Sequence, residues 1–159
     1  MAGSLWACAV QYLWPSTGLA GAQVVTKPRV LAAFTRHVFP YLEKTVGHYV
    51  DVVSVRTVEE ALERLREDRS IVLVLCGVFF NGSRMFELLR DVRQLNPRLP
   101  FIVCRILPLD LPQVSIEALT IALETLDARY IDVPLLEGKY GHEQAEAEFR
   151  STVLSRISR

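Results

Sequence analysis

The feature that most constrains the fold is a regular alternation of short apolar runs with amphipathic segments between residues 29 and 157. Five runs have the length and the apolar or β-branched composition of strands, at 29–34, 48–55, 71–80, 101–107 and 130–134. A segment with helical spacing follows each of them, at 37–46, 58–68, 84–95, 112–127 and 142–157. Strands and helices that alternate in this way form a parallel sheet with right-handed crossovers. The sequence therefore predicts an α/β fold, a doubly wound (βα)5 sheet of five parallel strands.

Local signals mark where some of these elements begin and end. Thr57 and Glu60 have the spacing of a capping box, so we expect a helix to begin after Thr57. Asn96-Pro97 ends the helical pattern that precedes it. The run IVLVLCGVFF at 71–80 is apolar throughout, which is typical of a central strand covered on both faces.

The bulk composition excludes several classes of protein. At 159 residues the chain has the length of one domain, and its 18 basic and 18 acidic residues give a formal net charge of +0. We therefore expect no nucleic-acid partner. The cysteines and histidines show no ligand spacing, which favours a reducing, cytoplasmic setting without metal or disulfides. No run reaches the roughly 18–20 apolar residues of a membrane span, so we expect no membrane partner.

Residues 1–28 differ from the rest of the chain. They hold both tryptophans, few charges and several Gly, Ser and Pro residues. The basic region of a signal peptide is missing, although Ala20-Gly21-Ala22 leaves a cleavage site as an alternative. We interpret residues 1–28 as an N-terminal arm, loosely ordered or packed on a domain formed by residues 29–159.

The predicted strand ends carry little chemistry. Ligands of parallel sheets bind beyond the carboxyl ends of the strands. In this sequence those positions are Phe34, Thr35, Cys76, Gly77, Arg105 and Val133. They include one cation and no carboxylate, whereas Mg²⁺ is usually bound through one or two carboxylates. We therefore expect no magnesium, no cofactor and no catalytic residue there, and predict that the chain is not an enzyme.

Over about residues 29–157 the chain resembles the receiver domain of bacterial two-component response regulators. The segments that carry the resemblance are VRTVEEALERLREDRSIVLVLCGV (55–78), MFELLRDVRQLNPRLPFIVC (85–104), VGHYVDVVSV (46–55) and ARYIDVP (128–134). It implies a flavodoxin-like sheet with strand order 2-1-3-4-5. It also implies that the helix at 112–127, the fifth strand and the last helix form a dimer face.

The same resemblance implies a degenerate receiver. The metal-binding acidic pair of the family falls on Phe34 and Thr35, and its phosphoacceptor aspartate falls on Gly77. Its Thr or Ser falls on Arg105, and its lysine falls on Val133. Glycine cannot form an acyl phosphate, so the scaffold is kept while the phosphoryl chemistry is lost. Tyr130 stands at the place of the family's switch aromatic.

Three residues at or near the strand ends allow two interpretations each. Cys76 is a reactive thiol or, more commonly for such a position, a buried strand cysteine. Arg105 helps to bind an anion or makes a salt bridge to a nearby carboxylate. Tyr130 is a packing switch or simply part of the core.

The helix at 112–127 carries more apolar surface than a sheet requires. Its apolar residues cover an arc of about 220°, whereas a stripe of about 100° suffices to cover a sheet. We expect Ile121, with Val114, Ala118 and Ala122, to face the sheet. The outward, partner-binding face would then consist of Ile116, Leu119, Leu123 and Tyr130. The alternative is that the N-terminal arm covers this surface.

These observations predict a phosphorylation-independent signalling module that acts by contact with a protein partner or with a second copy. The alternative is the receiver-like N-terminal wing, an assembly domain, of bacterial inducible amino-acid decarboxylases, which LPFIVCRILPLDLPQVSIEALT at 99–120 resembles. A third possibility is a small flavodoxin-like enzyme or binding protein, but the sequence has no Gly-rich phosphate loop.

Overall fold

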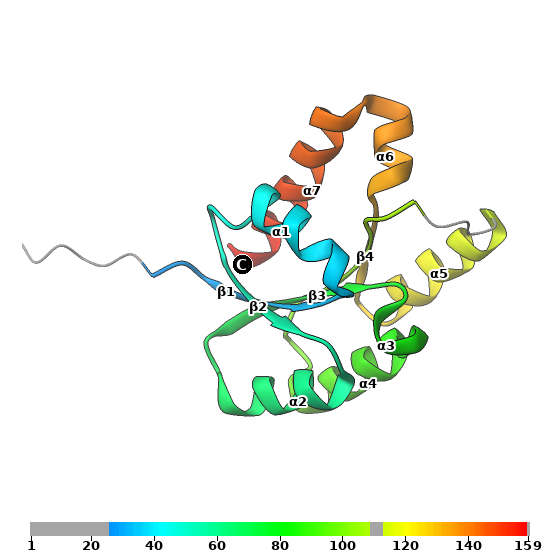
Figure 1. The fold of residues 1–159 in the computed structure, drawn as a ribbon. Coiled ribbons are helices and arrows are strands. Elements are labelled where there is room, and N and C mark those ends of the chain that lie inside the picture. The colour runs from blue at the N-terminus through cyan, green and yellow to red at the C-terminus, as the bar shows by residue number, and fades with distance from the viewer. Residues whose placement is uncertain (1–25, 109–112, 159) are drawn as a thin grey trace, which may run out of the picture.

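The sheet has the predicted strands in the predicted order. A computed structural model describes residues 26–108 and 113–158. Five parallel strands lie in the order β2-β1-β3-β4-β5. Figure 1 views the sheet from one edge. Their bounds are Arg29–Ala33 (β1), Asp51–Val55 (β2), Ile71–Gly77 (β3), Phe101–Arg105 (β4) and Arg129–Asp132 (β5). The (βα)5 fold and its 2-1-3-4-5 order are thereby confirmed.

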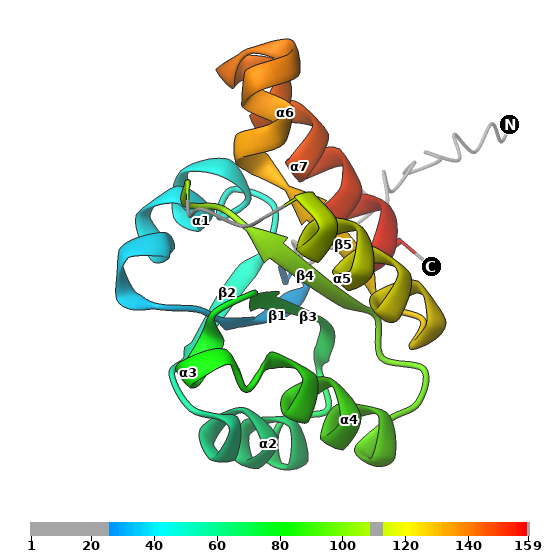
Figure 2. The same cartoon turned by 90° about the vertical axis from the view of Figure 1, so that its right-hand side faces the viewer.

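Helices cover both faces of the sheet. The helical elements are η1 (Arg36–Val38), α1 (Phe39–Thr45), α2 (Val58–Glu67), α3 (Phe80–Ser83), α4 (Met85–Leu95), α5 (Gln113–Thr125), α6 (Val133–Tyr140) and α7 (His142–Ile157). In Figure 1, α1 and α7 lie on one side of the sheet and α2 and α4 on the other. Figure 2 shows α5 beside β5, at the edge of the sheet, and α6 paired with α7.

Two cores result, one on each face. Because successive strand residues point to opposite faces, Leu31 and Ala33 of β1 join the core under α2 and α4, whereas Val30 and Ala32 join the core under α1 and α7. Burying a large aliphatic or aromatic side chain is worth about 1.5–3 kcal/mol. Residues 71–76 of β3 are all apolar because each of them faces one of these cores.

Side-chain contacts hold the helices in place. Thr57 Oγ1 accepts a hydrogen bond from the backbone N–H of Glu60 (3.1 Å), which confirms the predicted cap of α2. The carboxylate of Glu60 accepts from the N–H of Arg56 (2.8 Å). Arg84 forms ion pairs with Glu59 on α2 (2.7 Å) and Glu87 on α4 (2.6 Å), so it ties these helices together.

A second arginine joins α4 to the end of α5. The guanidinium of Arg93 donates to the carbonyl oxygens of Leu99 (2.6 Å), Leu126 (3.2 Å) and Asp127 (2.8 Å). Helix ends leave carbonyls without intrahelical partners, and Arg93 satisfies two of them just after α5. It therefore positions α5 against the rest of the domain.

Several observed strands are shorter than the predicted ones, and at two of them a helix begins where the strand was expected to continue. β5 ends at Asp132 and not at residue 134, because Val133 and Pro134 begin a helix, α6, that the sequence pattern did not predict. Gly141, with φ of 85°, lets the chain turn into α7. β3 ends at Gly77 and not at residue 80. The short element α3 begins at Phe80, and its residues Asn81, Gly82 and Ser83 have positive φ.

The predicted N-terminal arm lies outside the described residues except for its last three. Lys27 Nζ donates to the carbonyl of Gly47 (2.9 Å), and the chain then enters β1. Within residues 26–108 and 113–158, helices long and apolar enough to cross a membrane are absent.

Candidate functional site

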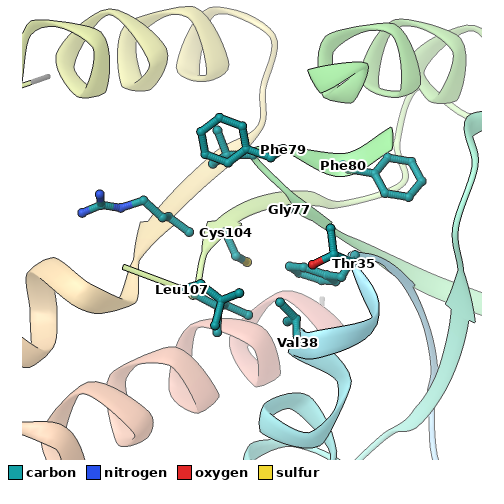
Figure 3. Close-up of a pocket in the computed structure, with 11 residues that line it drawn as sticks. Thr35, Val38, Gly77, Phe79, Phe80, Cys104 and Leu107 are labelled. Atoms are coloured by element: carbon teal, nitrogen blue, oxygen red, sulfur yellow. The ribbon is translucent and has the colours of Figure 1, made fainter. Parts of the chain in front are cut away.

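A small pocket lies at the carboxyl ends of β1, β3 and β4 (Figure 3). The parallel register brings these ends together, since Ala33 pairs with Cys76 and Gly77 pairs with Cys104. The pocket is lined by Phe34, Thr35, Val38, Gly77, Val78, Phe79, Phe80, Cys104, Arg105, Ile106 and Leu107. Four of the predicted strand-end residues therefore meet in one place: Phe34, Thr35, Gly77 and Arg105.

Two predicted residues do not line this pocket, and here the prediction is corrected. Cys76 is fully buried in the core under α2 and α4, because the alternation of β3 turns its side chain away from the pocket. Val133 is the first residue of α6 and packs into the opposite core. Burial raises the pKa of the Cys76 thiol well above its usual range, which favours the interpretation as a structural strand cysteine over a reactive thiol.

Cys104 is a pocket residue that the sequence analysis missed. It pairs with Gly77 across β3 and β4, so its side chain lies on the pocket side of the sheet. The thiol is buried, and this burial raises its pKa. Alternation along the strand could have identified Cys104, because Cys104 and Arg105 are neighbours and point to opposite faces of the sheet. The predicted site included only Arg105 at this strand end.

Phe34 and Gly77 lie next to each other in the lining of the pocket. Phe34 is almost completely buried. A Cβ atom placed on Gly77 would lie only 3.0 Å from Cδ1 of the Phe34 ring. A side chain at position 77 would therefore press against the aromatic ring of Phe34, which would have to shift by a few tenths of an ångström.

Arg105 turns out to be one half of a buried ion pair. Its Nη2 lies 2.8 Å from Oδ1 of Asp132, and the two side chains are 11% and 5% exposed. Asp132 also accepts hydrogen bonds from the hydroxyl of Tyr130 (3.0 Å) and from the N–H of Leu135 (3.0 Å), where it caps α6. Of the two interpretations of Arg105, the structure thus shows the salt bridge.

Asp132 corrects the expectation that the strand ends hold no carboxylate. The predicted strand ran to residue 134, which placed Asp132 inside it. An aspartate followed two residues later by proline is a typical start of a helix, and this signal could have identified Asp132 as the cap of α6.

Tyr130 is half-buried between the ion pair and the core. Its ring packs against the core under α2 and α4, and its hydroxyl donates to Asp132. Loss of hydration and the neighbouring Asp132 carboxylate raise the pKa of the hydroxyl. These contacts favour a core role for the ring, and a switching role stays a prediction.

The orientation of α5 is the reverse of the predicted one. Leu123 is fully buried and Ile116 nearly so, and Leu119 packs against the core, whereas Ile121 is 65% exposed. The width of the apolar arc could not say which part of it faces the protein, because α5 packs at the edge of the sheet. The predicted outward positions of Leu123 and Ile116 are therefore wrong.

A surface groove follows the free edge of β5. It is lined mainly by Thr120 and Ile116 of α5, residues 129–132 of β5, Leu135 and Leu136 of α6, and Glu148 and Thr152 of α7. Leu135 in this lining is a large exposed apolar residue, and Ile121 on α5 and Leu126 just after α5 are also exposed. The groove lies on the side of the molecule formed by α5, β5 and α7, and its use by a partner stays a prediction.

No family model matches the sequence, and no curated protein matches it either. Solved structures do match the fold. A response regulator from Thermotoga maritima has a TM-score of 0.63 and 22% identity over 84% of this chain and 99% of that one. A protein described as a response regulator from Chloroflexus aurantiacus has a TM-score of 0.62 and 22% identity, over 84% and 100%. A signal receiver domain from an HD domain-containing protein of Pseudomonas fluorescens has a TM-score of 0.54 and 19% identity, over 82% and 97%. The fold that the sequence resemblance implied is thereby confirmed, and by its fold the chain is a receiver-like domain.

Proposed function

We propose that the chain is a receiver-like signalling module that works by protein–protein contact, without phosphorylation and without catalysis. The observation that carries the proposal is the packing of Phe34 against Gly77. By the resemblance, Phe34 stands where the receiver family has a metal-binding acid, and Gly77 stands where it has the phosphoacceptor. The aromatic ring of Phe34 packs beside Gly77 in this chain.

The chemistry of the described pocket residues supports the same proposal. Uptake of a phosphoryl group on a receiver needs a carboxylate, which glycine lacks. Magnesium needs oxygen ligands in near-octahedral geometry. The polar side chains among the described lining residues are the Thr35 hydroxyl, the Cys104 thiol and the Arg105 guanidinium, and none of these is a carboxylate ligand for magnesium. In residues 26–108 and 113–158, groups of three or more His, Cys, Asp or Glu side chains that could hold a metal are absent.

The partner face that we propose keeps α5 and β5 of the face that the resemblance implied and takes α6 in place of the last helix, α7. Its apolar contacts are Ile121, Leu126 and Leu135. All three are exposed, and Leu135 also lines the groove along β5. Exposed apolar side chains that gather around a groove often mark an interaction site. A protein partner or a second copy of the chain would cover them.

Phosphoryl uptake is tested by incubating the full chain with acetyl phosphate and Mg²⁺ and measuring its intact mass. We expect no mass gain, while a receiver domain with its aspartate, treated in parallel, gains one phosphate. A magnesium-dependent gain of one phosphate by this chain would refute the proposal.

The partner face is tested by sedimentation of the native chain and of the variant Ile121→Glu with Leu135→Glu. We expect the double variant to lose self-association or partner binding while keeping its circular dichroism spectrum. Phe86→Glu on α4 is the matched control, because Phe86 is an exposed apolar residue distant from the groove in sequence and on another helix. A folded double variant with native mass and native partner binding would show that this face is not used.

A further inference from the structure

The pocket at the carboxyl ends of the strands is apolar and opens to the surface. Val38 and Leu107 lie around Cys104 in Figure 3, while Phe80 points away from them. At the rim, Phe79 and Leu107 are 39% and 38% exposed. Arg105, the one charged residue of the described lining, forms an ion pair with Asp132. The pocket therefore suits an uncharged, apolar side chain.

The chain itself contains a segment with matching chemistry. Residues 1–25, which lie outside the described part, contain no Asp, Glu, Lys, Arg or His, and they hold both tryptophans, Trp6 and Trp14. The groove along β5 is a poorer match, because Arg129, Asp132 and Glu148 line it. A tryptophan side chain carries one of the largest apolar surfaces available for burial.

The connection is also long enough. Lys27 is held to Gly47 beside the start of β1, and the pocket lies at the opposite end of that strand. A strand of this length spans roughly 17 Å at about 3.4 Å per residue. The residues between Trp14 and Lys27 can span up to about 40 Å at roughly 3.3 Å each.

We infer that this pocket is a docking site for a tryptophan of residues 1–25 of the same chain. In this arrangement the chain's own N-terminal segment covers the carboxyl ends of the strands, where a receiver scaffold carries its chemistry. The inference is independent of the proposed function, because the phosphate test above gives the same result whether or not the segment docks.

Tryptophan fluorescence of the full chain tests the inference, since it reports on residues 1–25 alone. We expect Leu107→Glu and Phe79→Glu to shift the emission maximum to longer wavelength and to increase quenching by acrylamide. Phe86→Glu, at a residue with 42% exposure on α4, and Ile121→Glu on α5 should leave both quantities unchanged. Trp6→Phe and Trp14→Phe then identify which tryptophan docks.

Several outcomes would overturn the inference. One is native emission like that of tryptophan in water, and another is emission that the two rim variants do not change. A shift of the tryptophan emission maximum with Ile121→Glu alone would place the segment on α5. A shift of this maximum on dilution of the native chain would show that the segment docks into a second copy. Each variant is first checked by circular dichroism, and Leu107→Ser or Phe79→Ser replaces a glutamate variant that does not fold.

Discussion

Replacement of Arg105 by glutamine should destabilise the domain far more than loss of a surface salt bridge. The variant leaves the Asp132 carboxylate, whose side chain is only 5% exposed, without its guanidinium partner at 2.8 Å. Breaking a buried ion pair by removing one partner costs about 3–5 kcal/mol. Asp132 keeps its two neutral donors, the Tyr130 hydroxyl and the Leu135 N–H, so we expect the lower end, about 3 kcal/mol.

Urea denaturation measures this loss. A fall of about 3 kcal/mol with a urea slope of about 1–3 kcal/mol/M lowers the midpoint by roughly 1–3 M. The matched control is Arg90→Gln, because Arg90 is an exposed arginine paired with Asp91 at 2.7 Å. Such a pair is worth about 0–1 kcal/mol.

The double variant Arg105→Gln with Asp132→Asn completes the test. Because it removes both charges, it should cost clearly less than the sum of the two single changes. If Arg105→Gln costs no more than Arg90→Gln, the pair behaves as an exposed one and the reasoning from burial is refuted. Additive costs would refute the coupling between the two residues.

Three further changes test the packing and the electrostatics of the helices. Leu123→Ala should lower the free energy of unfolding by about 2–5 kcal/mol, because this side chain is fully buried. Ile121→Ala, at an exposed position, should change it by no more than about 0.5 kcal/mol in the same urea assay. Equal losses in the two variants would contradict the orientation of α5. Arg93→Met should lower the free energy of unfolding by about 1–3 kcal/mol, because three carbonyl oxygens lose their donor, and a native melting temperature in a thermal scan would count against that role. Arg84 lowers the pKa of Glu59 and of Glu87 below the ordinary value of 4.5. The contribution of these ion pairs to stability is therefore complete above pH 4.5, and it is lost as the pH falls through the lower pKa values of the folded state. In Arg84→Gln the decline of stability towards acid pH should be smaller, and an unchanged decline in acid titrations would refute the bridge.

Much of the fold could be predicted because its signals are local. The alternation of apolar runs and helical stripes is a property of neighbouring residues, and it located all five strands and the helices α1, α2, α4, α5 and α7. The capping residue Thr57 is also local, and the structure has it where the sequence places it. The helix α6 was missed because it is short and begins directly at the end of β5.

The sequence by itself determined the (βα)5 sheet, since the sheet follows from residue type and spacing. That Phe34 and Gly77 stand at acidic positions of a receiver is what the resemblance implies, and it stays a prediction. Only the tertiary structure decided that Arg105 pairs with Asp132 across two strands, that Cys76 and Cys104 face opposite cores, and that Leu123 points inward. The register between strands decides the first two, and the packing of α5 against the sheet edge decides the third. Both depend on contacts between residues far apart in the chain, which no local pattern contains.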